Sequence, residues 1–490
     1  MHGDWRAELL GGGQVTKFPS FGDVPGKSNA ASGIAMMQKR VFKRYVGPLL
    51  ALSAACALAG CASYHKAPLQ LSADLPTSPL KLHRRLPDGR TIPVTPPLPA
   101  RDIAALAVLN DPDLIAARAQ AGVAQAELLN AGLLPDPSIN AGFAALISGP
   151  ADVPAISGGL TQDLSALITY SVNRQAAKAG LAQVNAGILW QEWQVATQAE
   201  QLCITLDSDA RLIATLRADR TQLERVNQAT ASQVRAGNLT LTAQSASMAA
   251  LAATDTLLNS TLQTRDTDRD QLDALLGLQP GVELATRLPQ VAPVDPARAR
   301  QAVATLARRR PDLIALRYGY AQADAKLRAA ILTQFLPISL GGTAGRDTTR
   351  VVSAGPQLTL NLPLFNRNRG NIAIARATRK QLAAQFAASL DSAASGANAL
   401  ILRIGVLESQ AATASQQARA ARAIAAQARH AFAQGALDAL GAVNLETAAS
   451  DREREAITLH AQLLAARLSL NALLGIGLPP IAEPDRNRNS

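Results

Sequence analysis

The sequence predicts a mainly helical protein with a small β part, in which a unit of two strands, a long helix and a second helix occurs twice. Three observations predict this class. Apolar residues make up 48% of the chain but aromatic residues only 3%, a composition that suits closely packed helices. No proline lies between Pro154 and Pro280 or between Pro363 and Pro479, so two long stretches are free to form uninterrupted helices. Finally, short motifs recur at an offset of 198 or 199 positions.

Residues 1–60 are predicted to be a leader that contains a signal peptide. A basic stretch at residues 39–44 precedes an apolar run at residues 46–58, which is too short to cross a bilayer as a helix. Met36 and Met37 stand just before the basic stretch and are candidate starts. Translation from either of them would leave out residues 1–35.

The leader ends in Leu58-Ala59-Gly60-Cys61, which resembles the lipobox of bacterial lipoproteins. This resemblance implies that Cys61 is lipidated and becomes the mature N-terminus. The next residue is Ala62 and not aspartate, which by the same resemblance favours the outer membrane. An ordinary signal peptide cleaved nearby is the alternative.

The cysteines indicate a chain without disulfides. Cys56 lies in the leader and Cys61 would carry lipid, which leaves only Cys203. A single thiol has no partner for an intramolecular bond. We expect Cys203 to be a buried packing residue on a helix.

Charge and motifs argue against nucleic-acid binding, catalysis and metal binding. The formal net charge is +11, but the excess is scattered and not interleaved with aromatic residues. No metal-binding or nucleophile motif occurs, and the P-loop-like residues 22–28 are one residue short and precede the candidate starts. The four of the five histidines that follow the candidate starts, at positions 65, 83, 430 and 460, have no ligand spacing. We therefore expect no catalytic residue, no bound metal and no cofactor.

Residues 61–100 are predicted to be a lipid-anchored, extended tether because they hold eight prolines. Two copies of the repeated unit follow, at residues 101–290 and 291–480, and a polar tail occupies residues 481–490. Pro-Asp-Leu-Ile-Ala at 112–116 recurs at 311–315, and Leu-Leu-Gly at 275–277 recurs at 473–475. The duplication predicts that both copies have the same element order.

Each copy is expected to open with a short helix and then form two strands. Residues 139–147 alternate apolar with small or polar residues, and a second strand is expected at residues 156–167. Copy two repeats the alternation near Ile338 and again at residues 357–362. Soluble hairpins packed on helices are the alternative for these strands.

The helical stretches carry a repeat typical of supercoiled helices. Apolar positions in copy two step by four and three from Leu400 to Phe432, a period of 3.5 residues. The corresponding helix of copy one is expected at residues 169–236, which is about 100 Å at 1.5 Å per residue. Return helices are expected at residues 242–278 and 441–474, each stacked end to end with the short helix that opens its copy.

These elements predict a trimer. Four strands cannot close a barrel in a membrane, and an open edge in lipid leaves backbone groups unpaired. The smallest membrane barrels have eight strands. A lipid-anchored chain with four strands must therefore share a barrel, and three copies supply twelve. The helical seams also require neighbours.

Residues 100–480 resemble the TolC-type outer-membrane efflux proteins. The resemblance is carried by the two Pro-Asp-Leu-Ile-Ala openings and by Leu-Pro-Leu-Phe-Asn-Arg-Asn-Arg-Gly at 362–370. It is also carried by the glycine turns expected after the two long helices, at Gly237 and Gly435. It implies a homotrimer with a twelve-stranded β-barrel in the outer membrane and a long α-helical barrel in the periplasm. It also implies a passive exit duct for solutes that works with a periplasmic adaptor and an inner-membrane pump.

The resemblance further implies where the adaptor docks and what is exported. The turns Gly237-Asn238 and Gly435-Ala436 would lie at the periplasmic tip, where adaptors dock. The stretch at 362–370 is more similar to the branch that serves heavy-metal pumps than to the branch that serves drug pumps.

A pore gate is expected just beyond the second turn. The family's best-studied members carry two aspartates there, and the positions aligned from Gly435 are Gly441 and Asn444. An acidic ring is therefore not expected. Asp438 and Glu446 are the nearby acidic candidates, with a solvated helix face as the simpler interpretation of each.

Two other functions remain open. A coiled-coil scaffold that tethers the cell envelope would share the helical repeat but would not need the strands. A duct for protein secretion would share every feature described above.

Overall fold

The computed structural model describes residues 64–145, 147–148, 153–335, 338–478 and 481. The leader with Cys61 and the polar tail from residue 482 lie outside the described residues. The chain divides into two units, which meet between residues 75 and 76. Of the smaller unit, residues 64–75 are described and are exposed. The remaining description concerns the larger unit.

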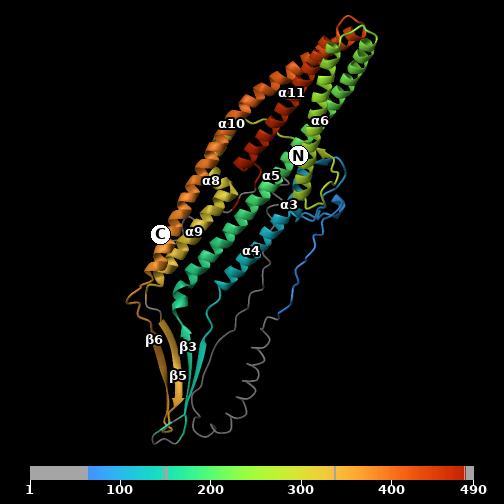
Figure 1. The fold of residues 1–490 in the computed structure, drawn as a ribbon. Helices are drawn as coiled ribbons and strands as arrows, with labels where there is room; N and C mark the ends of the chain where they lie inside the picture. The colour runs from blue at the N-terminus through green and yellow to red at the C-terminus, as the bar shows by residue number, and fades with distance from the viewer. Residues whose placement is uncertain (1–63, 146, 149–152, 336–337, 479–480, 482–490) are drawn as a thin grey trace. The chain divides into compact units, whose positions relative to one another are not determined.

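Both copies contain the predicted order of elements (Figure 1). Copy one comprises α3 (Ala100–Asn110), α4 (Pro112–Asn130), β2 (Ser138–Ala144), β3 (Ala155–Asp163), α5 (Ser165–Arg235) and α6 (Leu241–Leu275). Copy two comprises α7 (Pro296–Val303), α8 (Leu306–Arg309), α9 (Pro311–Leu332), β5 (Ile338–Arg346), β6 (Val352–Leu360), α10 (Arg369–Ala433) and α11 (Ala439–Leu474).

The second strand of copy one ends earlier than predicted. It was expected to continue to residue 167, but β3 ends at Asp163 and α5 begins at Ser165. The Asp163 carboxylate accepts a hydrogen bond from the Ser165 backbone N–H at 2.8 Å. This side chain satisfies a backbone donor at the start of the helix and so ends the strand.

The duplicated Pro-Asp-Leu-Ile-Ala motif begins a helix in both copies. Pro112 and Pro311 occupy the first helical position, where the missing N–H costs nothing. Six residues farther along, duplicated arginines bond back to the preceding helix. Arg118 Nη2 donates to Val108 O at 2.6 Å, and Arg317 Nη1 donates to Ala307 O at 3.3 Å. The repeat therefore preserves a junction between two helices as well as a helix start.

The two long helices pack against stacked pairs of shorter ones. α9 and α11 each pack against both α5 and α10. At the junction of α11 and α9, Arg310 Nη1 lies 3.5 Å from Leu473 O. In copy one, a Cβ at Gly277, just after α6, would lie 3.1 Å from Asn110 O and 3.9 Å from Cγ of Pro112, the first residue of α4. The predicted end-to-end stacking is confirmed in both copies.

The 3.5-residue seam of α10 is buried as predicted. Six seam positions are buried along the helix: Ile404, Leu407, Ala414, Ala418, Ala425 and Ala428. Small alanine side chains allow the neighbouring helix α11 to approach closely.

The predicted extended tether is wrong for its second half. Strand β1 (Leu98–Pro99) pairs in parallel with β4 (Thr286–Arg287), and Leu82 and Ile92 are buried in the same cluster as Leu98. The prolines exclude long regular elements here, but the apolar residues between them still pack on the helices. Residues 79–99 are thus part of the folded unit.

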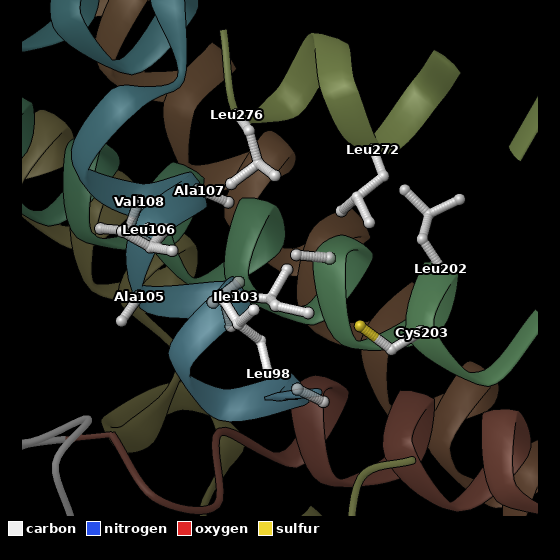
Figure 2. Packing of buried hydrophobic residues seen from close by; sticks show 14 of the residues in the cluster. Leu98, Ile103, Ala105, Leu106, Ala107, Val108, Leu202, Cys203, Leu272 and Leu276 are labelled. Carbon is white, nitrogen blue, oxygen red and sulfur yellow. The ribbon is translucent and has the colours of Figure 1, made fainter. Parts of the chain in front are cut away.

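Cys203 is buried, as expected, in a cluster formed by α3, α5 and the end of α6 (Figure 2). Its side chain belongs to the same buried cluster as Ile103, Leu202 and Leu272 and has no exposed surface of its own. Burial raises the pKa of the Cys203 thiol to about 12, and the charge of Glu200 adds to the shift. The thiol therefore stays protonated at neutral pH and acts as a small apolar side chain.

Candidate functional site: an amphipathic sheet and two hairpin turns

The four strands form one antiparallel sheet in the order β2-β3-β5-β6. The central pair joins the two copies, because β3 of copy one bonds to β5 of copy two. The outer strands β2 and β6 each have one edge that no described strand pairs. These edges are free to pair with another chain.

The register divides the sheet into an apolar and a polar face. Ile139, Leu160 and Gly342 lie directly opposite one another across three strands. Because directly paired residues point to the same side, each such row belongs to one face. The first face carries mostly aliphatic and small residues: Ile139, Ala141, Phe143, Ile156, Leu160, Ile338, Leu340, Ala344, Val352, Leu358 and Leu360.

The opposite face carries small and polar residues. Its rows are Ser138-Thr161-Gly341-Gln357, Asn140-Gly159-Thr343-Gly355 and Gly142-Ser157-Gly345-Ser353. The strands approach so closely that a Cβ at Gly341 would lie 2.4 Å from Leu160 O. The side chains of both faces are largely exposed within a single chain.

The apolar face is long enough for a membrane-spanning strand. Its rows run from Ile338 to Arg346, a step of eight residues or about 26 Å along the strand at 3.3 Å per residue. Strands that cross a membrane in a barrel are tilted and have about 9–11 residues. Aromatic residues mark both ends, with Phe143 in the outermost row and Phe335 and Phe365 beside the helices, all highly exposed. Membrane barrels have an apolar band about 25 Å tall with aromatic girdles at both interfaces.

Two equivalent turns connect α5 to α6 and α10 to α11. Both turns lie at the end of the helices opposite to the sheet (Figure 1). After α5, Asn238 N bonds to Gln233 O at 2.9 Å and Gly237 N bonds to Val234 O at 3.0 Å. After α10, Ala436 and Gly435 make the corresponding bonds. These pairs are Schellman motifs, which require a left-handed residue at the glycine position. Gly237 has φ +77° and Gly435 has φ +73°.

The gate candidates next to the second turn have different environments. Asp438 is the N-cap of α11 and accepts a hydrogen bond from Gly441 N at 2.8 Å. Glu446 is buried and pairs with Arg429 of α10 at 2.5 Å. Asn444 is exposed. Of the four predicted positions, Glu446 therefore joins α10 to α11 and Asp438 caps α11, and Asp438 and Asn444 are the two with exposed polar side chains.

Polar contacts also join the two hairpins near these residues. The Asp219 carboxylate of α5 accepts a hydrogen bond from the Ser450 hydroxyl of α11. Burial raises the pKa of Asp219, which the Ser450 hydrogen bond partly opposes. Apolar contacts between Leu223 and Val226 of α5 and Val443 of α11 complete this junction.

A buried tryptophan of α5 also joins the two copies, and this contact was not predicted from the sequence. Trp193 of α5 is 1% exposed, and its indole N–H donates to Ala472 O at the end of α11 at 2.9 Å. The duplication gave no signal for it, because the equivalent position in copy two is Asp391, which is exposed.

The described residues include no cluster of three His, Cys, Asp or Glu side chains that would hold a metal ion.

Comparison with known proteins gives one family and one fold. The family described as outer membrane efflux protein matches residues 301–476. No curated protein matches the sequence. Among solved structures, the outer membrane protein VceC from Vibrio cholerae has a TM-score of 0.65 at 18% identity, covering 77% of this chain and 96% of that one.

Two further solved structures share the fold. The structure of CusC, a protein that undergoes conformational changes on folding and transmembrane channel formation, has a TM-score of 0.66 at 15% identity, and the match covers 85% of this chain and 100% of that one. The CmeC outer membrane channel from Campylobacter jejuni has a TM-score of 0.65 at 13% identity and covers 78% and 87%.

Proposed function

We propose that the chain, whose residues 301–476 match the outer membrane efflux protein family, is a member of that family and forms the outer-membrane channel of a tripartite efflux pump. Three copies close one twelve-stranded barrel through the outer membrane, and their helices form a barrel that extends into the periplasm. The assembly is a passive duct that carries small solutes, such as heavy-metal ions or drugs, from an inner-membrane pump and its periplasmic adaptor to the exterior.

The two-faced sheet is the observation that carries this proposal. An apolar outer face that extends about 26 Å along β5 suits lipid, and a polar inner face of Gly, Ser, Thr and Asn suits a water-filled pore. Since β2 and β6 run in opposite directions within the antiparallel sheet, β6 of one copy can pair antiparallel with β2 of the next. The closed barrel then has no unpaired edge.

The helices also present a surface that suits a neighbouring copy. Leu402, Val406 and Ile424 of α10 are 50–67% exposed, and Val406 and Ile424 lie 18 residues, or five helical turns, apart. This stripe lies away from the seam that packs on α11. An apolar stripe that water would otherwise hydrate supports contact with the next subunit.

By length and composition alone, α10 and α11 would each suffice to cross a membrane. α10 nevertheless has 65 residues, about 98 Å at 1.5 Å per residue, which is three times the thickness of a hydrocarbon core. Exposed arginines recur along it at positions 376, 403 and 419. We therefore assign the membrane segment to the strands.

The proposal predicts a conducting trimer. Native mass measurement of the purified protein in detergent is expected to give three protomers, and reconstitution into planar bilayers is expected to give ion conductance. Deletion of the gene is expected to lower resistance to pump substrates. A stable monomer or dimer would contradict the shared barrel, a trimer without conductance would favour the envelope scaffold, and unchanged resistance with lost secretion of a protein would favour the secretion duct.

We also propose that Cys61, which lies outside the described residues, anchors the chain to outer-membrane lipid. Incorporation of a labelled palmitate analogue is expected in the wild-type chain and is expected to disappear in Cys61→Ser. Labelling that persists in the variant would show that the leader is an ordinary signal peptide.

The glycine turns are proposed to dock the adaptor at the periplasmic tip. Gly435→Val is expected to lower efflux and adaptor crosslinking while trimer levels stay near normal. A Cβ at Gly435 meets nothing within 4 Å, so the local cost is backbone strain alone, on the order of 1–2 kcal/mol. Crosslinking, trimer level and substrate resistance are measured in one strain.

Gly435→Asn separates the two effects of that substitution. Asparagine tolerates the left-handed conformation but still adds a side chain at the tip. If docking needs the bare turn, both variants lose crosslinking. If both variants crosslink normally, the glycine serves only to end the helix. Gly237, with the same geometry, gives an independent repeat of the comparison.

A further inference from the structure

The apolar face of the sheet carries a cation at its outer rim. Arg346 is the last residue of β5, and the residues directly opposite it are Ile156 on β3 and Val352 on β6. Phe143 lies next in the same row, opposite Ile156. The register therefore places the Arg346 side chain among apolar neighbours, on the face proposed to contact lipid.

No carboxylate neutralises this arginine within the described residues. Asp347 follows it directly, but this carboxylate serves the β5–β6 turn, where its Oδ1 accepts hydrogen bonds from Thr349 N at 2.9 Å and from Val351 N at 2.8 Å. The Nε atom of Arg346 is shielded from solvent and has no hydrogen-bond partner. A planar guanidinium with free donors is thus held against an aliphatic and aromatic surface.

The depth of Arg346 indicates which group supplies the missing acceptor. A cation is costly at the middle of a bilayer but tolerated near the interface. Arg346 lies about 26 Å from the row of Ile338, at the end of the strands far from the periplasmic helices. If the sheet spans the outer membrane as proposed, this row lies at the headgroup boundary of the outer leaflet.

We propose that Arg346 binds a phosphate group of a phosphorylated glycolipid headgroup in the outer leaflet. Its guanidinium presents parallel N–H donors that match two phosphate oxygens, while Phe143 and Ile156 contact the acyl chains beside that headgroup. Each copy of the trimer contributes one such site. The inference rests on the proposed function, because it requires the sheet to face lipid.

The test measures lipid binding to the purified trimer with lipid A as the probe. Titration followed by native mass measurement is expected to show up to three lipid A molecules on the wild-type trimer. Arg346→Gln is expected to weaken binding by about tenfold or more, which corresponds to the loss of one charged hydrogen-bonding group. Arg346→Lys is expected to lie between the two, since an ammonium keeps the charge but loses the paired donors.

Arg350→Gln is the matched control, because it removes the same charge from an exposed residue of the same hairpin. It is expected to leave affinity within about twofold of wild type. Dephosphorylated lipid A is expected to bind the wild-type trimer as weakly as lipid A binds Arg346→Gln. Equal affinity of the wild type and Arg346→Gln for lipid A, or equal binding of the dephosphorylated lipid, would overturn the inference.

Trimer mass and conductance of the same samples separate this inference from the proposed function. A wild-type chain that forms no conducting trimer contradicts the function itself. Conducting Arg346→Gln trimers that bind lipid A normally contradict only the lipid site. A change of ion selectivity in Arg346→Gln without a change in lipid binding would place the arginine in the pore and likewise overturn the inference.

Discussion

Leu160→Arg is expected to remove the protein from the outer membrane. Leu160 lies in the middle row of the apolar face, opposite Ile139 and Gly342. An arginine at the bilayer midplane of a barrel costs about 2–4 kcal/mol, and a trimer carries this cost three times, on the order of 6–12 kcal/mol. The measurement is the amount of heat-resistant trimer in the outer-membrane fraction.

Thr161→Arg provides the control on the same strand. Thr161 points to the opposite face, where its neighbours across the sheet are Ser138 and Gly341. Both are small, so a long side chain can extend into the pore, and assembly is expected to stay close to the wild-type level. Normal assembly of Leu160→Arg, or an equal loss in both variants, would show that the two faces do not divide lipid from water.

Trp193→Ala is expected to cause the largest loss of stability within the helical part. It removes a fully buried indole, which costs about 3–5 kcal/mol in typical cores. It also removes the N–H that satisfies Ala472 O near the end of α11. For a chain of this size, the midpoint of thermal unfolding of the purified trimer is expected to fall by roughly 3–6 °C.

Two variants test whether this loss comes from burial and the hydrogen bond together. Trp190→Ala removes the same side chain three residues away, where it is only partly buried and stacks on Arg310 at 4.6 Å. Its midpoint is expected to fall by less than half as much. Trp193→Phe, which keeps an aromatic ring but no donor, is expected to lie between wild type and Trp193→Ala. Equal shifts for the two alanine variants would mean that Trp193 has no special role in joining the copies.

Local sequence determined the elements and their order. The proline-free stretches, the 3.5-residue seam and the two glycines each act over a few neighbouring residues, so helix lengths and turns were predicted within a few positions. Because the unit occurs twice, each element was predicted from two stretches of sequence, and the two copies form the same elements. Strand alternation was likewise local and placed an apolar and a polar face on each strand.

The tertiary structure decided what depends on distant residues. Pairing of β3 with β5, burial of residues 79–99 and the contact of Trp193 with α11 each join segments that are far apart in sequence. Local sequence also left the roles of charged residues open. Glu446 was a candidate for a pore gate or a solvated helix face, and only the packing of α10 on α11 shows that it is buried and paired with Arg429. Periodicity specifies which side of an element is apolar, but the identity of the group that covers it depends on how the whole chain packs.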